Sequence, residues 1–271
     1  MDDQRQGGTH PETQERLRHG SSFGGAAAAY AEHRPDYAEA AVRWALEPVW
    51  SRQPLRVVDL GAGTGKLTAT LIRLGADVTA VEPDQNMLAE LRRELAPVRS
   101  VPGRAEAIPL PDASVDAVLA GQAMHWFDLD RAAPEIARVL VPGGVFAGLW
   151  NVEDDRVGWV AGFTAMTKRK TSITVLRWLD GSARSRQEGL IAAAAGLFVA
   201  AQTAEFGHGQ ARTVDSLLAT IATHSNFLVM EEPARTALLA RARDFLQAQP
   251  ETSHGDFVLP MSTVALRALR T

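Results

Sequence analysis

From residue 55 onward, the hydrophobic and polar positions of the chain alternate between short apolar runs and amphipathic segments. The first apolar run, Arg-Val-Val-Asp-Leu at 56–60, has the length and composition of a buried strand. Further apolar runs predict strands at 77–82, 98–101, 115–120 and 145–150. Between these runs, apolar residues recur at helical spacing after residue 66, within 85–95 and within 129–140. Strands that alternate with helices in this way are typical of βαβ units in a parallel sheet.

The second half of the chain has a less regular pattern. We expect one or two helices in 151–197, and further helices at 213–223 and 232–247. Strands are predicted at 198–206 and 256–268, although Pro260 is an unfavourable residue inside a central strand because it has no N–H to donate. No internal repeat and no linker divides the chain. We therefore expect one domain, 23–271, preceded by a polar, disordered tail at 1–22.

Composition and charge exclude several classes of function. The 271 residues include no cysteine, so disulfides, thiolate metal ligands and cysteine nucleophiles are excluded, and a cytoplasmic location is expected. With 28 basic and 32 acidic residues the net charge is −4, which disfavours nucleic acid and anionic membranes as partners. The N-terminal run 1–22 contains no apolar stretch of the kind a signal peptide needs, and the longest apolar run, 190–201, is too short for a membrane span. We expect a soluble protein, and the sequence leaves its oligomeric state open.

A glycine-rich turn, Gly-Ala-Gly-Thr-Gly at 61–65, joins the first predicted strand to the first helix. Such a turn lets a ligand approach the backbone closely. A phosphate-binding P-loop is excluded because Leu60 and Leu67 stand where that motif needs a glycine and a Ser or Thr. A dinucleotide fingerprint is disfavoured because Lys66 replaces its third glycine. Glu82 ends the second strand, where a carboxylate can bind both ribose hydroxyls, so the pattern indicates a nucleoside without pyrophosphate.

Four segments in order resemble the class I S-adenosylmethionine-dependent methyltransferases with a type 11 methyltransferase domain. They are 57–65 (Val-Val-Asp-Leu-Gly-Ala-Gly-Thr-Gly), 81–88 (Val-Glu-Pro-Asp-Gln-Asn-Met-Leu), 103–112 and 138–144. Within that family, 122–128 (Gln-Ala-Met-His-Trp-Phe-Asp) followed by 149–151 (Leu-Trp-Asn) is most similar to small-molecule enzymes of the trans-aconitate methyltransferase type. The resemblance implies an α/β, Rossmann-like fold. Its seven-stranded sheet is mostly parallel with an antiparallel last strand, and it carries helices on both faces and a helical lid.

The resemblance also implies how the domain is organised. We expect an N-terminal helical cover at 23–50, a cofactor-binding core at 55–150 and a helical lid insertion at 151–197. The remaining segment, 198–271, is expected to complete the sheet and to carry further helices. The cover can close over the cofactor as a mobile lid, or it can be a helix fixed on the sheet.

S-adenosylmethionine is the cofactor that the resemblance implies, with S-adenosylhomocysteine as the product. Its binding residues are expected in the glycine turn, at the end of the second strand, on the adenine side, after the fourth strand and on the N-terminal cover. In that order they are Asp59, Gly61, Ala62, Gly63, Thr64 and Gly65; Glu82, Pro83 and Met87; Ala105 and Glu106; Gln122 and Ala123; and Tyr30 and Arg34.

His125, five residues beyond the fourth predicted strand, is the candidate catalytic residue. As a base it could deprotonate a hydroxyl, and as a cation it could orient a carboxylate. A structural role under the lid is the third alternative. We expect no catalytic role for His208 or His224. No metal site is expected, because 121–124 holds no carboxylate cluster for Mg²⁺.

The leading interpretation is methyl transfer to an oxygen, of a carboxylate or a hydroxyl, on a small-molecule acceptor. One alternative is an enzyme that binds S-adenosylmethionine without transferring its methyl group, such as a biosynthetic cyclase. Another is an NAD-dependent Rossmann oxidoreductase, which the residue at the third-glycine position disfavours. Modification of nucleic acid is the least favoured function because of the charge balance.

Overall fold

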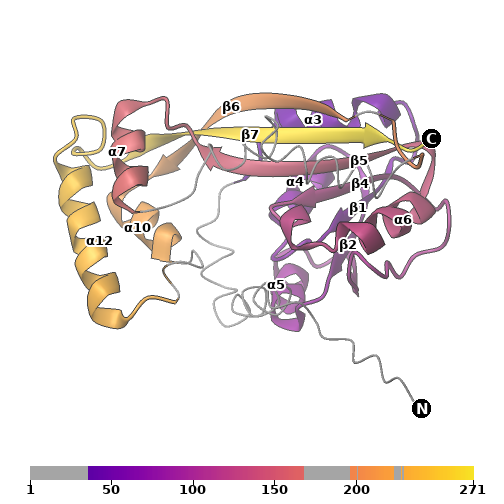
Figure 1. Cartoon of the computed structure of the whole chain (residues 1–271), viewed down its shortest axis with the longest axis horizontal. Helices are drawn as coiled ribbons and strands as arrows, with labels where there is room; N and C mark the ends of the chain where they lie inside the picture. Colours follow the sequence, from indigo (N-terminus) through magenta and orange to yellow (C-terminus); the bar gives the residue numbers. More distant parts are fainter. Residues whose placement is uncertain (1–35, 168–195, 200, 223–226, 228) are drawn as a thin grey trace, which may run out of the picture.

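A computed structural model describes residues 36–167, 196–199, 201–222, 227 and 229–271 (Figure 1). The predicted tail, the candidates Tyr30 and Arg34, His224 and most of the predicted lid insertion lie outside these residues. The described residues form a seven-stranded sheet with the order β3-β2-β1-β4-β5-β7-β6. Its strands are β1 (Arg56–Leu60), β2 (Asp77–Glu82), β3 (Arg99–Pro102), β4 (Val115–Gly121), β5 (Leu140–Glu153), β6 (Gln202–Arg212) and β7 (Phe257–Leu269).

Strand direction confirms the predicted fold class. β1 pairs in parallel with β2 and with β4. The pairs β2–β3 and β4–β5 are also parallel. β7 is antiparallel to both of its neighbours, β5 and β6. The sheet therefore has the parallel strands expected from the alternating pattern and, as the family resemblance implies, a Rossmann-like arrangement with an antiparallel last strand.

Helices cover both faces of the sheet, and local sequence determines where several of them begin and end. Asp84 caps the start of the helix α5 (Gln85–Glu94), because its carboxylate accepts hydrogen bonds from the N–H groups of Asn86 and Met87. Gly75 has φ +85° and ends the helix α4 (Lys66–Arg73), where it donates its N–H to the carbonyl of Ile72. No helix in the described ranges has the length and apolar character needed to cross a bilayer. The helices are α3 (Glu39–Leu46), η2 (Glu47–Val49), α4 (Lys66–Arg73), α5 (Gln85–Glu94), η3 (Met124–Trp126), α6 (Leu129–Val139), α7 (Gly158–Met166), α10 (Val214–Ala222) and α12 (Glu232–Gln247).

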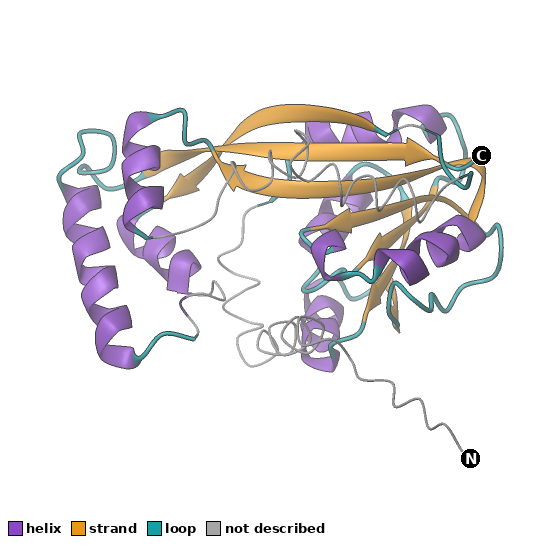
Figure 2. Ribbon diagram, viewed as in Figure 1, coloured by secondary structure: helices purple, strands orange, loops and turns teal. Residues whose placement is uncertain are grey.

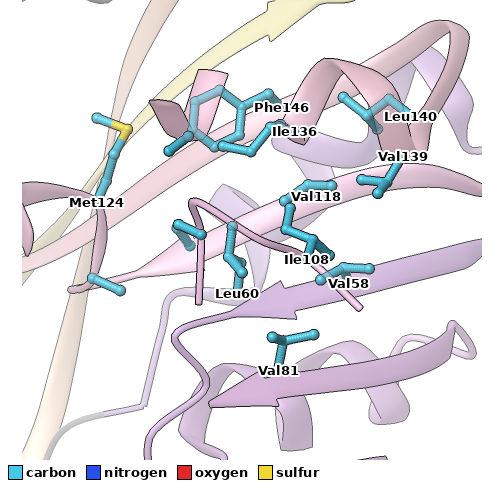
Figure 3. Close-up of a cluster of buried hydrophobic side chains, with 14 of the residues drawn as sticks. Val58, Leu60, Val81, Ile108, Val118, Met124, Ile136, Val139, Leu140 and Phe146 are labelled. Atoms are coloured by element: carbon cyan, nitrogen blue, oxygen red, sulfur yellow. The ribbon is translucent and has the colours of Figure 1, made fainter. Parts of the chain in front are cut away.

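Successive strand residues point to opposite faces, so the sheet has a hydrophobic cluster on each side. On one face, Val58 and Val118 pack with Ile136 of α6 (Figure 3). On the other face, Leu119 packs with Leu71 of α4 and with the buried side of α3. These two clusters hold β1, β2 and β4 rigidly, and the ends of those strands position the candidate site.

β5 is longer than predicted at both ends. The expected strand was 145–150, but β5 begins at Leu140, where it pairs with Val115, and it continues to Glu153. The register shifts between Val115 and Ala117, and this irregularity accommodates Pro142, Gly143 and Gly144 within the strand. Residues 151–153, expected in the helical insertion, therefore belong to the sheet.

The sixth strand was predicted at 198–206, but β6 spans Gln202–Arg212. The run Gly-His-Gly-Gln-Ala-Arg at 207–212 lacks strand-forming residues, and pairing with β7 makes it a strand. β5, β7 and β6 extend as a ribbon beyond β1 and β4 (Figure 2). α7, α10 and α12 pack on this ribbon around a third hydrophobic cluster, which includes Phe163, Leu217 and Leu246.

Pro260 lies inside β7, opposite Gly209 of β6. Its carbonyl accepts a hydrogen bond from the N–H of Asp154 at 3.0 Å. The N–H and C=O of one residue in an antiparallel strand point to the same side, so the missing N–H of Pro260 faces β5. Pairing with β5 ends one residue away, at Glu153 and Met261, and the ladder to β6 therefore loses no hydrogen bond.

Candidate functional site

The carboxyl ends of β1, β2, β4 and β5 lie together at one edge of the sheet. The N–H groups of Gly61 and Ala62 donate to the carbonyl of Val81 at 2.8 and 3.1 Å, which ties the glycine turn to β2. The N–H of Gln122 donates to the carbonyl of Leu149 at 2.8 Å, which ties the end of β4 to β5. Segments distant in sequence thus lie together at one edge, where a parallel sheet is expected to bind its ligand.

Three glycines in the turn adopt left-handed backbone conformations, with φ of +72° at Gly61, +56° at Gly63 and +91° at Gly65. A Cβ atom at Gly61 would lie 2.7 Å from Cβ of Ala123, and one at Gly65 would lie 2.8 Å from Cδ1 of Leu95. A Cβ atom at Gly63 would meet no atom within 4 Å. Gly61 and Gly65 are therefore required for packing, whereas Gly63 faces open space next to the turn.

Glu82 connects the glycine turn to the segment after β2. Its carboxylate is only 7% exposed, and it accepts the N–H of Gly63 on one oxygen and that of Asp84 on the other, both at 2.8 Å. Burial raises the pKa of Glu82, and the two N–H donors oppose this rise. Each carboxylate oxygen keeps a second lone-pair direction, which can accept a hydroxyl group of a ligand.

Asp59, at the end of β1, is 1% exposed. Oδ2 accepts a hydrogen bond from Oγ1 of Thr68 at 2.5 Å, and burial raises the pKa of Asp59 to about 7. In the described part of the chain, Oδ1 of Asp59 and Oγ1 of Thr64 are buried without hydrogen-bond partners. Because a buried polar atom without a partner is costly, this pair beside the glycine turn fits a bound polar ligand.

The residues predicted after Glu82 and on the adenine side have different surroundings. Met87 on α5 and Ala105 are buried, and Pro83 is exposed at the end of β2. The carboxylate of Glu106 accepts the N–H of Asp128 at 2.9 Å. Its side chain therefore holds the segment before β4 against the start of α6.

The loop after β4 carries the candidate catalytic residue. Gln122 has φ +53°, unusual for a residue other than glycine, and its Nε2 donates to the carbonyl of Asn151 at 2.8 Å. This contact fixes the start of η3. His125, within η3, is half-buried, and its ring centroid lies 4.7 Å from that of Trp126. The histidine therefore lies directly beyond the carboxyl end of β4.

Sequence reasoning missed a polar network beside this loop. Nδ2 of Asn151 donates to the carbonyl of Asp36 at 3.0 Å, and Oγ1 of Thr263 donates to Oδ1 of Asn151 at 2.6 Å. Nε2 of His208 lies 3.2 Å from the same Oγ1. Asp36 also pairs with Nζ of Lys66 at 3.7 Å. The only local signal was Asn151 itself, because the other members come from distant segments.

Comparison with known proteins identifies the family. A family model described as a methyltransferase domain matches residues 58–148. The chain is 39% identical over 248 residues to the uncharacterized methyltransferase Rv3342 of Mycobacterium tuberculosis. The aligned region covers 91% of this chain and 95% of that protein. It is 36% identical over 132 residues to a malonyl-[acyl-carrier protein] O-methyltransferase of Enterobacter lignolyticus, covering 47% of this chain and 51% of that protein.

A solved structure supports the same assignment. The protein, described as a type II methyltransferase of Anaeromyxobacter dehalogenans, is 26% identical with a TM-score of 0.56, and the match covers 88% of this chain and 97% of that one. The fold, the glycine turn followed by an acidic residue at the end of β2, and the near full-length relative agree. The chain belongs to the S-adenosylmethionine-dependent methyltransferases, and S-adenosylmethionine is its cofactor.

Proposed function

We propose that this methyltransferase transfers the methyl group of S-adenosylmethionine to an oxygen atom on a small-molecule acceptor. The oxygen belongs to a hydroxyl or a carboxylate. The observation that carries the methyl-donor site is the open position at Gly63 beside the buried carboxylate of Glu82, where a ligand can approach the backbone at the edge of the sheet. The partial similarity to malonyl-[acyl-carrier protein] O-methyltransferases favours oxygen as the accepting atom.

The residues of the glycine turn would hold the cofactor through their backbone N–H groups, with Asp59 and Thr64 supplying buried polar atoms. Glu82 would accept the ribose hydroxyls. When bound, the cofactor supplies a methyl group activated by a positively charged sulfonium. The other proposed contacts are Pro83 and Met87 after β2, Ala105 and Glu106 on the adenine side, Gln122 and Ala123 after β4, and Tyr30 and Arg34 of the N-terminal cover.

Methyl transfer is an in-line displacement, so the protein chiefly holds two reactants aligned and excludes water. Alignment alone can provide effective molarities of about 10⁵ M or more. The site contains the groups for this task at the ends of β1, β2 and β4. His125 is proposed to contact the reacting oxygen of the acceptor, because it follows β4 directly and is fixed by η3.

The cofactor site is tested by replacing Glu82 with alanine. We expect Glu82→Ala to weaken S-adenosylhomocysteine binding by about 1–3 kcal/mol, the usual cost of losing hydrogen bonds to a charged group. Isothermal titration calorimetry measures the change, and Glu82→Gln, which keeps one accepting oxygen, should lose less. Glu94→Ala, on the exposed side of α5, is the control and should bind normally. Unchanged affinity in a folded Glu82→Ala protein would show that the ribose lies elsewhere.

The role of His125 is tested by steady-state kinetics of His125→Gln. If His125 orients the reacting oxygen, the variant should raise KM about tenfold, because one hydrogen bond is worth about 1–1.5 kcal/mol, and should change kcat less. A fall in kcat of about 10²-fold with constant KM would instead identify His125 as the base. Wild-type values for both constants would leave it a structural role only.

A further inference from the structure

The inward face of β6 changes character along the strand. Phe206 packs with Trp44 of α3 at a ring-centroid distance of 6.0 Å, as a core residue should. The next residues on the same face are His208, Gln210 and Arg212, all polar and all partly or fully buried. Buried polar side chains need hydrogen-bond partners, and His208 has one in Oγ1 of Thr263 on β7.

Hydrogen bonding determines the tautomer of His208. Oγ1 of Thr263 accepts the N–H of Ala38 at 3.0 Å and donates its single hydrogen to Oδ1 of Asn151 at 2.6 Å. The Asn151 atom that faces Thr263 is the amide oxygen, because Nδ2 of the same amide donates to the carbonyl of Asp36. The hydroxyl therefore has no hydrogen left for Nε2 of His208, which lies 3.2 Å away. Nε2 must be the donor, so Nδ1 carries the lone pair.

The surroundings of His208 suit a group that accepts a proton and then releases it. No hydrogen bond from the described residues engages Nδ1. Burial lowers the pKa of His208, so the ring is neutral at pH 7, while the carboxylate of Asp36 opposes this shift and would stabilise the protonated ring. The other charged groups here are Lys66 on α4, Glu153 on β5 in the same cross-strand row, and Arg212 further along β6.

His208 is also connected to the methyl-transfer edge. The carbonyl of Asn151 accepts Nε2 of Gln122, and the side chain of Asn151 binds Thr263, which binds His208. Three hydrogen bonds therefore join the ring to the loop after β4. The polar face of β6 is thereby linked to the loop after β4, which borders the proposed methyl-transfer edge.

We propose that His208 accepts the proton of a hydroxyl group on the methyl acceptor, which makes the acceptor an alcohol or a phenol. This inference rests on the proposed transfer to oxygen and narrows it. As the acceptor oxygen forms its bond to the methyl carbon, the hydroxyl proton passes to Nδ1. The methyl–sulfur bond breaks with its electron pair remaining on sulfur, and the imidazolium then releases the proton to water. His125 is left to orient the oxygen.

The first test measures directly which nitrogen of the His208 ring carries the proton. ¹⁵N NMR of the histidine side chains in the protein loaded with S-adenosylhomocysteine, assigned with His208→Gln, should show His208 protonated at Nε2 above pH 7. Thr263→Val removes the oxygen that accepts this N–H, and it should weaken the preference for the Nε2–H tautomer. A ring protonated at Nδ1 in the wild type would overturn the proposal.

The second test uses labelled S-adenosylmethionine with a panel of simple phenols and alcohols and, as counterparts, benzoic and aliphatic carboxylic acids. Methylation of hydroxyl compounds is expected. If only acids are methylated, or if neither set is methylated by a protein that binds S-adenosylhomocysteine, the inference about His208 fails. Failure to bind S-adenosylhomocysteine at all would instead count against the proposed function.

The third test compares His208→Gln with wild type on a methylated phenol. Its carboxamide can still donate to Thr263, so S-adenosylhomocysteine affinity and KM should stay within twofold, while kcat should fall about 10²-fold or more at pH 8. The wild-type kcat should fall on the acid side of the ring's pKa, and this acid limb should be absent from the variant. His254→Gln, at an exposed position before β7, is the control. A retained acid limb, or lost cofactor binding, would contradict the proposal.

Discussion

Replacing Gly63 by valine should abolish binding of S-adenosylhomocysteine, with an affinity loss of about 100-fold or more, while the fold survives. The turn is open at this position, where a Cβ would meet no atom within 4 Å, and the N–H of Gly63 is bound to Glu82. A branched side chain would fill the space through which the cofactor approaches the backbone. It would also strain a residue at φ +56° and displace that N–H.

Backbone strain alone must be separated from this effect, and the chain offers a matched control. Gly75 has φ +85° and also has no atom within 4 Å of its Cβ position, but it lies at the end of α4 away from the glycine turn. Gly75→Val should cost stability by a similar amount, at least about 1–2 kcal/mol, and should bind S-adenosylhomocysteine normally. Calorimetry and thermal unfolding of both variants decide the matter. Near-normal binding by Gly63→Val would refute the role of the turn.

The second large effect concerns the dependence of stability on pH in the absence of cofactor. Burial raises the pKa of Asp59 from 3.8 to about 7, so between these values the folded protein holds a proton that the unfolded chain releases. The free energy of unfolding should therefore fall as pH rises from about 4 to 7, by up to about 4 kcal/mol for a shift of this size. Glu82, whose pKa burial also raises, acts in the same direction.

Asp59→Asn tests this expectation, because asparagine has the same shape and does not titrate. Urea unfolding at pH 5, 6, 7 and 8 should show a steep loss of stability in the wild type and a flatter dependence in the variant. The comparison uses the slope, so a constant cost of the new amide does not affect it. Asp112→Asn, at an exposed carboxylate, should keep the wild-type slope. Equal slopes for Asp59→Asn and wild type would show that Asp59 titrates as in the unfolded chain.

Local sequence by itself determined the first half of the fold and indicated the proposed cofactor edge. β1 and β2 have the predicted bounds, and α12 spans the predicted 232–247, because short apolar runs and helical periodicity are local properties. The glycine turn and Glu82 could be proposed as site residues for the same reason, since the turn directly follows β1 and Glu82 is the last residue of β2. The match to a methyltransferase family then excluded the NAD-dependent alternative, which rested on the same turn.

The tertiary structure alone decided how the far side of the site is built. Residues 207–212 form a strand only because β7 pairs with them, and β5 reaches Glu153 because β7 continues beside it. The same register places Thr263 between Asn151 and His208, which are 57 residues apart in the chain. No local pattern carries this information. Cross-strand partners are selected by pairing across the whole sheet, so the proximity of their side chains is a property of the folded chain.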